Sequence, residues 1–205
     1  MLRFMNRANL LTLFGLSAAL SGAILAINGK LHFGLVALVL SGLCDLFDGP
    51  LARTLDLDEE QRRFGARLDS LSDASCFGVA TAVILHAAGL RSPAELLVVI
   101  AVALCAVWRL AYFDTVGLVQ VEGQAPRFRG LPTTYAALLV PTAGLARLHS
   151  LEALRVAMNV TGILMAVAMV SPLPIPKPGR RSYPFLLLLA VGAIGLHVAI
   201  GMGRL

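Results

Sequence analysis

Four aspartates lie inside or beside apolar segments of this sequence, where a carboxylate is costly. Asp45 and Asp48 are three residues apart near the end of one apolar run, and Asp69 and Asp73 are four residues apart at the start of the next. Side chains at these spacings share one face of a helix. Charged residues within a membrane span usually face an interior cavity or a partner. These four residues are therefore the first candidates for chemistry.

The chemistry that the four carboxylates predict is binding of divalent metal ions. The two apolar runs are consecutive and joined by a short loop, so an antiparallel helix pair brings Asp45 and Asp48 to the same depth as Asp69 and Asp73. Without a counter-charge these groups would repel strongly at low dielectric. Their charge matches two divalent cations, and oxygen ligands suit Mg²⁺, Mn²⁺ or Ca²⁺. We expect two such ions between the helices.

Small and basic residues next to the aspartates indicate that a ligand approaches closely. Gly49 and Ala52 follow the first pair, and Gly65 precedes the second. Small residues on a helix face allow such an approach. The guanidinium of Arg53 could bind a phosphate oxygen, or it could reach the membrane interface without a specific ligand. The alternative is a structural network in which the aspartates pair with Arg53 and Arg67; the regular spacing and the glycines favour a ligand site.

The remainder of the sequence predicts a membrane protein. Of 205 residues, 58% are hydrophobic and 14% are charged. Mean hydropathy is +0.81, and a soluble domain needs more charge to cover its surface. Segments of roughly 20 apolar residues can span a bilayer, and the candidates are 8–27, 32–53, 64–89, 93–114, 132–148, 152–171 and 184–203. We expect an all-α, polytopic bundle of six to seven transmembrane helices, with 132–148 the shortest. It forms a single integral-membrane domain over 1–205, with an extra C-terminal helix at about 184–203.

Basic residues predict the orientation of this bundle. The net charge is +5, but no stripe of Lys and Arg alternates with aromatic residues, so we expect no nucleic-acid partner. With the N-terminus inside, the cytoplasmic segments contain Arg3, Arg7, Arg53, Arg62, Arg63, Arg67, Arg127, Arg129, Lys177, Arg180 and Arg181, against Lys30, Arg91, Arg147, Arg155 and Arg204 outside. This excess obeys the positive-inside rule. It predicts a multi-pass protein of the cell (inner) membrane whose aspartates face the cytoplasm.

Four other acidic residues have a simpler explanation. Asp56, Asp58, Glu59 and Glu60 are predicted to form a solvated loop between the second and third spans.

A function from another class, a cation transporter, would also place acids in a membrane. Transport sites usually lie near the midplane, whereas these aspartates gather at one face, which favours an enzyme.

The aspartate pattern resembles the signature of the CDP-alcohol phosphotransferase family. The residues that carry the resemblance are Asp45-x2-Asp48-Gly49-x2-Ala52-Arg53, followed by Gly65-x3-Asp69-x3-Asp73. The spacer from Thr54 to Phe64 is longer than is usual in that family.

Within the family, the phosphatidylserine synthase branch is the most similar. The stretches "FGARLDSLSDASCFGVA" at 64–80, "WRLAYFD" at 108–114 and "FRGLPTTYAA" at 128–137 resemble its motifs. Tyr112 and Asp114 depart from that branch, which has Arg and Asn there, and Thr81 replaces a proline. Branches that use inositol phosphate or glycerol phosphate usually have a basic residue after the fourth aspartate, where this chain has Ala74.

The resemblance implies transfer of a phosphatidyl group from CDP-diacylglycerol to the hydroxyl of a small polar alcohol, L-serine in the first instance, with release of CMP. Choline, glycerol phosphate or an inositol phosphate is the alternative acceptor. It implies that the four aspartates ligate two metals and that Asp73 is also the general base. It assigns the CDP moiety to Asn9, Thr12, Gly49, Ala52, Arg53 and Gly65, with Arg109 and Arg129 as candidates for binding the acceptor. Arg109 could equally pair with Asp114. The partners implied are membrane lipids and a second copy of the chain in a homodimer.

Overall fold

The structure is a computed structural model that describes residues 2–118, 127–176, 179 and 182–204. It confirms the all-α membrane bundle. The main helices are α1 (Arg7–Ile27), α2 (Leu31–Ala52), α3 (Glu59–Asp73), α4 (Thr81–Ala87), α5 (Pro93–Val116), α6 (Ala136–Gly144), α7 (Leu151–Val170) and α8 (Tyr183–Gly201). Among the described residues, six helical runs are long and apolar enough to cross a membrane. Lys177, Arg180 and Arg181, which entered the charge comparison, lie outside the described residues.

The third span is one continuous helical run from Glu59 to Ala87, built from α3, the π-helical segment η2 (Ala74–Ala80) and α4. It begins earlier than predicted, because Asp58 caps it. The Asp58 side chain accepts from the Gln61 backbone N–H at 2.8 Å, and Gln61 accepts in return from the Asp58 N–H at 3.0 Å. Glu59 and Glu60 are therefore in the first helical turn, where negative charge is favourable. The prediction that they lie in a loop is wrong.

The shortest predicted span, 132–148, is not a full membrane helix. It divides into the 3-10 turn η3 (Thr133–Tyr135), the nine residues of α6 and the 3-10 turn η4 (Leu145–Leu148). Pro141 lies inside α6, and a proline within a helix removes one backbone hydrogen bond. The count within the described residues is therefore six spans plus this half-length segment.

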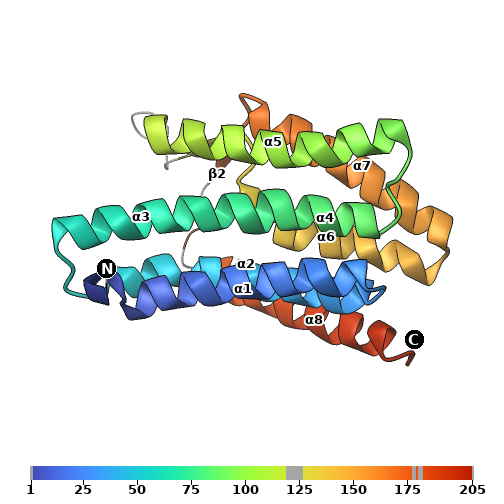
Figure 1. The fold of residues 1–205 in the computed structure, drawn as a ribbon, viewed down its shortest axis with the longest axis horizontal. Coiled ribbons are helices and arrows are strands. Elements are labelled where there is room, and N and C mark those ends of the chain that lie inside the picture. The colour runs from blue at the N-terminus through green and yellow to red at the C-terminus, as the bar shows by residue number, and fades with distance from the viewer. Residues whose placement is uncertain (1, 119–126, 177–178, 180–181, 205) are drawn as a thin grey trace.

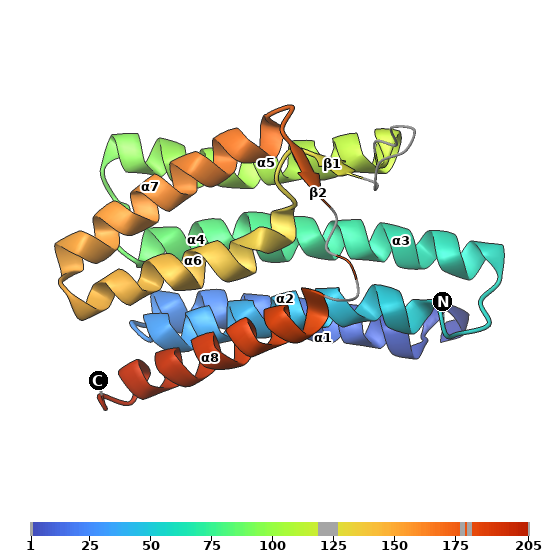
Figure 2. The same cartoon turned by 180° about the vertical axis from the view of Figure 1, so that it is seen from behind.

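The helices form three layers around the third span (Figures 1 and 2). α3 and α4 occupy the middle with α6; α5 and α7 lie on one side, and α1, α2 and α8 lie on the other. The buried apolar core contains Ala19, Leu38, Phe77, Val102 and Met158. α1 and α2 approach so closely that a Cβ on Gly22 would lie 2.8 Å from the Gly34 carbonyl oxygen. Small residues permit such packing between membrane helices.

Two short strands connect the segments that follow α5 and α7. β1 (Arg127–Arg129) pairs antiparallel with β2 (Pro174–Pro176), with Phe128 opposite Ile175. Gly130, at φ +81°, donates its N–H to the Leu173 carbonyl at 2.9 Å. This ribbon fixes the chain that leads into η3 and α6.

Candidate functional site

Three of the four predicted carboxylates converge between α2 and α3. Oxygen atoms of Asp45, Asp48 and Asp69 all lie within 4.8 Å of one another. Asp48 is 7% exposed. α2 ends and α3 begins at the same end of the bundle, so the antiparallel pair brings the acids together, as their spacing predicts. Within the described part of the chain, none of these aspartates forms an ion pair with a basic side chain, so the structural ion network is not seen.

Asp73 lies on the same small cavity but is not part of this three-residue cluster. The cavity is lined by Thr12, Gly15, Leu16, Ser41, Cys44, Asp45, Asp48, Asp69, Ser72, Asp73, Cys76 and Phe77. Its lining combines the aspartate carboxylates with the thiols of Cys44 and Cys76 and the ring of Phe77. A fourth carboxylate beside the cluster provides a group that can act as a further ligand or accept a proton.

The donor set fits a divalent metal ion. The Ser72 hydroxyl is buried, lines the acidic cavity and has no hydrogen-bond partner among the described residues. A buried polar atom without a partner calls for an explanation such as an ion or its water. Clustered carboxylate oxygens in a low-dielectric site likewise require a cation. Ser72 was not singled out from the sequence, although its place between Asp69 and Asp73 was a signal.

Thr12 belongs to this site through a hydrogen bond. Its Oγ lies 2.7 Å from Asp48 Oδ2 and 3.2 Å from the Ala8 carbonyl oxygen. Thr12 comes from α1, so a third helix orients one of the clustered carboxylates. The family resemblance assigned Thr12 to the CDP moiety; the structure brings its hydroxyl to Asp48.

All six residues predicted to bind the CDP moiety line one cavity of about 360 Å³ between α1, α2 and α3. They are Asn9, Thr12, Gly49, Ala52, Arg53 and Gly65, and Asp48 and Asp69 lie at the same cavity. A Cβ on Gly49 would meet nothing within 4 Å, so this position opens onto empty space. Sequence reasoning missed Gln61 and Arg62, which also line the cavity; their place in a loop predicted to be solvated concealed them.

Asn9 is partly committed to the local fold. Its amide donates to the Phe4 carbonyl at 2.8 Å. Its side-chain oxygen lies close to Gly65, where a Cβ would be only 3.2 Å from that oxygen. The absence of a side chain on Gly65 therefore lets α3 approach α1 at Asn9. Both residues line the 360 Å³ cavity.

A second cavity, of about 310 Å³, lies on the other side of α2. It is lined mostly by apolar groups from α2, α6 and α8, among them Leu46, Leu138, Leu186, Ala190 and Ala193. Asp45, Gly49 and Arg53 also line it. Gly49 and Arg53 therefore border both cavities, and the aspartate cluster lies between them. Thr134 and Tyr135, which the sequence did not single out, complete the polar side of the second cavity.

Arg109 and Arg129 are in different environments. Arg109 is 5% exposed, and its guanidinium lies 5.0 Å from the ring centroid of Phe113 and 5.4 Å from that of Phe128. Among the described residues it forms no ion pair with Asp114, which instead accepts from the Ser70 hydroxyl at 2.9 Å. Arg129 is exposed, with Nη1 3.4 Å from the Tyr112 hydroxyl. A role for either residue in acceptor binding stays a prediction.

Comparison with known proteins gives a consistent result. The model of the CDP-alcohol phosphatidyltransferase family matches residues 5–174. The archaetidylserine synthase of Methanothermobacter thermautotrophicus is 28% identical over 178 residues, which cover 85% of this chain and 71% of that protein. The CDP-diacylglycerol–serine O-phosphatidyltransferase of Methanocaldococcus jannaschii is 34% identical over 161 residues, 78% and 70% of the two chains. The enzyme of that name from Saccharomyces cerevisiae is 33% identical over 152 residues, 68% and 54%.

The family match covers α1 to α7, and it includes both aspartate pairs and the glycines and arginine beside them. α8 lies beyond the matched residues but lines the second cavity. Together with the converging carboxylates, the match identifies the chain as a membrane enzyme of the CDP-alcohol phosphatidyltransferase family.

Proposed function

We propose that this enzyme transfers the phosphatidyl group of CDP-diacylglycerol to the hydroxyl of L-serine, giving phosphatidylserine and CMP. The observation that carries the proposal is the acidic cluster of Asp45, Asp48 and Asp69 between two cavities, one that includes amide and guanidinium side chains such as Gln61 and Arg62 and one lined mainly by aliphatic residues. A lipid diphosphate has a polar nucleotide at one end and two apolar tails at the other. The relatives named as serine transferases support serine as the acceptor.

In this proposal the two cavities bind the two halves of the donor. The cytidine and its phosphates occupy the 360 Å³ cavity, where Gly49 leaves room for the diphosphate and Arg53 supplies a positive charge. The diacylglycerol enters the 310 Å³ cavity, whose lining of Leu186, Ala190 and other apolar side chains suits hydrocarbon. The reacting phosphorus then lies over Gly49, next to the aspartate cluster.

Asp45, Asp48 and Asp69, with Asp73 completing a second site, would hold two Mg²⁺ or Mn²⁺ ions. When bound, such ions neutralise the diphosphate and stabilise the departing phosphate oxygens. The residues of the chain orient the carboxylates and exclude water. Thr12 holds Asp48 in orientation, and the closely packed helices around Phe77 exclude water from below the cluster.

The bond changes follow from this arrangement. The serine hydroxyl oxygen attacks the phosphorus that bears the diacylglycerol, a new P–O bond forms, and the P–O bond to CMP breaks. The proton of the serine hydroxyl passes to the Asp73 carboxylate, which is the proposed general base. CMP leaves with the bonding electron pair. Asp73 suits this role because it lines the acidic cavity outside the three-residue cluster.

The deciding experiment is an acceptor panel. Purified enzyme with Mg²⁺ or Mn²⁺ is given CDP-diacylglycerol and, in separate reactions, L-serine, choline, glycerol phosphate, inositol phosphate or inositol, and release of CMP is measured. We expect release with serine alone. A parallel set with a CDP-linked diether lipid tests the donor. Release with another alcohol and not with serine overturns the assignment of the acceptor, and release with none overturns the proposed reaction.

We further propose that the chain acts as one domain in a homodimer, with its site facing the cytoplasm of the cell membrane. The end of the bundle that holds the aspartates also has Arg3, Arg7, Arg53, Arg62, Arg63 and Arg67, which supports this orientation by the positive-inside rule. Labelling a single cysteine introduced at Arg62 in right-side-out and inverted vesicles tests it. Light scattering of the detergent-solubilised protein tests the dimer.

A further inference from the structure

The third span changes its helical geometry directly after the last aspartate of the site. α3 ends at Asp73, the π-helical segment η2 runs from Ala74 to Ala80, and α4 begins at Thr81. A π turn contains about one residue more than an α turn, and π segments in α-helices occur frequently at functional sites. This one separates the acidic half of the span from the apolar half that packs in the core.

The π segment keeps both halves of the span facing the interior. The inward positions step along the span as Asp69, Asp73, Phe77, Ala80, Ile84 and Ala88. The average spacing between these consecutive inward positions is longer than the 3.6 residues of an α turn. A continuous α-helix with Ile84 and Ala88 in the core would therefore turn the aspartates away from α2, by about the 100° that one residue subtends. The additional residue in η2 removes this drift.

Thr81 closes the π segment with its side chain. Its backbone N–H donates to the Gly78 carbonyl, three residues back. Its hydroxyl donates to the Cys76 carbonyl, five residues back, at 3.2 Å. Thr81 and Cys76 are 0% and 3% exposed, so bulk water does not reach this bond. A bond to the carbonyl five residues back spans the same interval as a π-helical backbone bond, and hydroxyls that bond to carbonyls of their own helix alter its local geometry; the hydroxyl therefore favours the π geometry over an α-helical one.

The segment that Thr81 closes also forms the floor of the site. Cys76 and Phe77 are 3% and 1% exposed and line the acidic cavity below Asp45, Asp69 and Asp73. We propose that Thr81 is a positioning residue: its hydroxyl holds η2 in the geometry that aims Asp69 and Asp73 at Asp45 and Asp48. The inference rests on the metal site proposed above.

The test measures metal binding directly. Mn²⁺ is titrated into full-length protein in detergent, without substrate, and the free ion is followed by electron paramagnetic resonance. We expect Thr81→Val, which keeps the shape and removes the hydroxyl, to weaken Mn²⁺ binding by about tenfold or more, the usual effect of removing a group that orients ligands. Thr81→Ser keeps a hydroxyl, and it should bind Mn²⁺ within about threefold of the parent protein. The metal concentration for half-maximal CMP release should shift in parallel.

Thr142→Val is the matched control, because the Thr142 hydroxyl also donates to a carbonyl of its own helix, Leu138, at 2.7 Å, but on an exposed face of α6. It should bind Mn²⁺ as the parent does. Parent-like binding by Thr81→Val, or equal losses in Thr81→Val and Thr81→Ser, overturns the role of the hydroxyl. So does a Thr81→Val protein that fails to fold, since Thr81 then supports the core as a whole. If the parent itself binds no Mn²⁺, the proposed metal site fails, and the inference fails with it.

Discussion

The hydroxyl of Thr12 lies 2.7 Å from Oδ2 of Asp48, and this bond connects α1 to the acidic face of α2. Both residues are buried, at 9% and 7% exposed. A hydrogen bond to a carboxylate in such a place is stronger than one between neutral groups. It occupies Oδ2 of Asp48 and restricts the orientation of this carboxylate. The first helix therefore acts on the acidic cluster without contributing a charge to it.

Replacing Thr12 by Val should weaken the site without unfolding the bundle. The substitution keeps the branched shape and removes the donor to Asp48. Groups that orient metal ligands typically contribute 10- to 100-fold in affinity or activity, so we expect a loss of about 10-fold or more in the rate of CMP release. Thr12→Ser, which keeps the hydroxyl, should retain most of the rate. Equal activity of the valine and serine variants would show that the bond to Asp48 is not required.

Asp73→Asn should abolish turnover and leave the fold intact. The amide cannot accept the acceptor's proton, and it is a poorer ligand for a hard cation. General-base groups contribute about 10²- to 10⁴-fold, so CMP release should fall by at least about 100-fold, with a thermal transition near that of the parent protein. The control is Glu152→Gln, an exposed acid in the first turn of α7, which should be fully active. A fully active Asp73→Asn enzyme would contradict the assignment of the base.

The sequence predicted which carboxylates converge more accurately than where the surrounding helices begin and end. The i,i+3 and i,i+4 aspartate pairs on consecutive apolar segments are sufficient to bring Asp45, Asp48 and Asp69 together. Helical periodicity is a local property, and the antiparallel arrangement follows from the short connection. For the same reason Gly49 and Gly65 could be predicted to lie beside a cavity next to the aspartates.

One missed feature is local, and the others depend on contacts between distant segments, which local patterns do not report. The start of α3 at Glu59 follows from a capping box at Asp58 and Gln61, which a charge-rich stretch concealed. The bond between Thr12 and Asp48 joins residues far apart in the chain. The apolar cavity beside α8 results from the packing of α2, α6 and α8. Composition gives the hydrophobicity of such segments, but it does not show which of them line a cavity together.

Gly130→Ala should destabilise the protein by disrupting the chain between α5 and α6. Gly130 has φ +81°, and a Cβ there would lie 2.4 Å from the Met169 carbonyl oxygen. A left-handed conformation alone disfavours a residue with a Cβ by about 1–2 kcal/mol, and the clash adds to this. We expect a clear decrease in the thermal transition temperature in detergent, with loss of activity because Arg129 and Thr134 flank this turn.

The matched control for this prediction is Gly29→Ala. Gly29 also has positive φ, +78°, but a Cβ there would meet nothing within 4 Å. Its cost should be limited to the backbone conformation. If both variants lose the same stability, the close approach of Gly130 to the end of α7 contributes nothing measurable.

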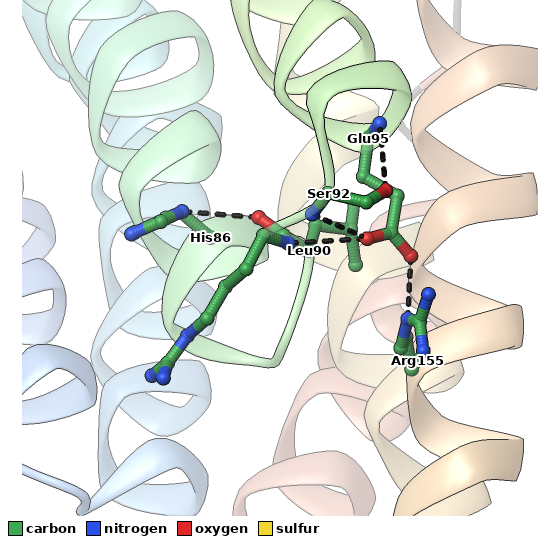
Figure 3. A network of polar contacts seen from close by, with 6 residues as sticks. His86, Leu90, Ser92, Glu95 and Arg155 are labelled. Carbon is green, nitrogen blue, oxygen red and sulfur yellow. Dashed lines mark hydrogen bonds and ion pairs between the residues drawn. The ribbon is translucent and has the colours of Figure 1, made fainter.

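At the opposite end of the bundle, Glu95 joins the α4–α5 turn to α7 (Figure 3). Its carboxylate accepts from the backbone N–H of Arg91 at 3.1 Å and of Ser92 at 2.9 Å, and from Arg155 Nε at 2.6 Å. Glu95 is 5% exposed. Arg155→Met removes the only cation that pairs with this carboxylate among the described residues. A carboxylate left without its partner is strongly destabilising, so the thermal transition should fall.

The double variant Glu95→Gln with Arg155→Met should recover part of the stability lost in Arg155→Met, because the substituted side chain at position 95 has no charge to neutralise. Arg63→Met is the comparison, since it breaks the exposed pair of Arg63 with Glu59 within α3, and exposed pairs contribute little. None of the three variants changes a residue of the aspartate cluster, so metal-dependent CMP release at low temperature should persist. If Arg63→Met proves as harmful as Arg155→Met, the low exposure of Glu95 does not strengthen its ion pair. The double variant could instead be less stable than Arg155→Met alone. The backbone N–H groups of Arg91 and Ser92 would then require the charge on Glu95 even without its arginine. In that case the α4–α5 turn contributes more than the ion pair to the stability of this end of the bundle.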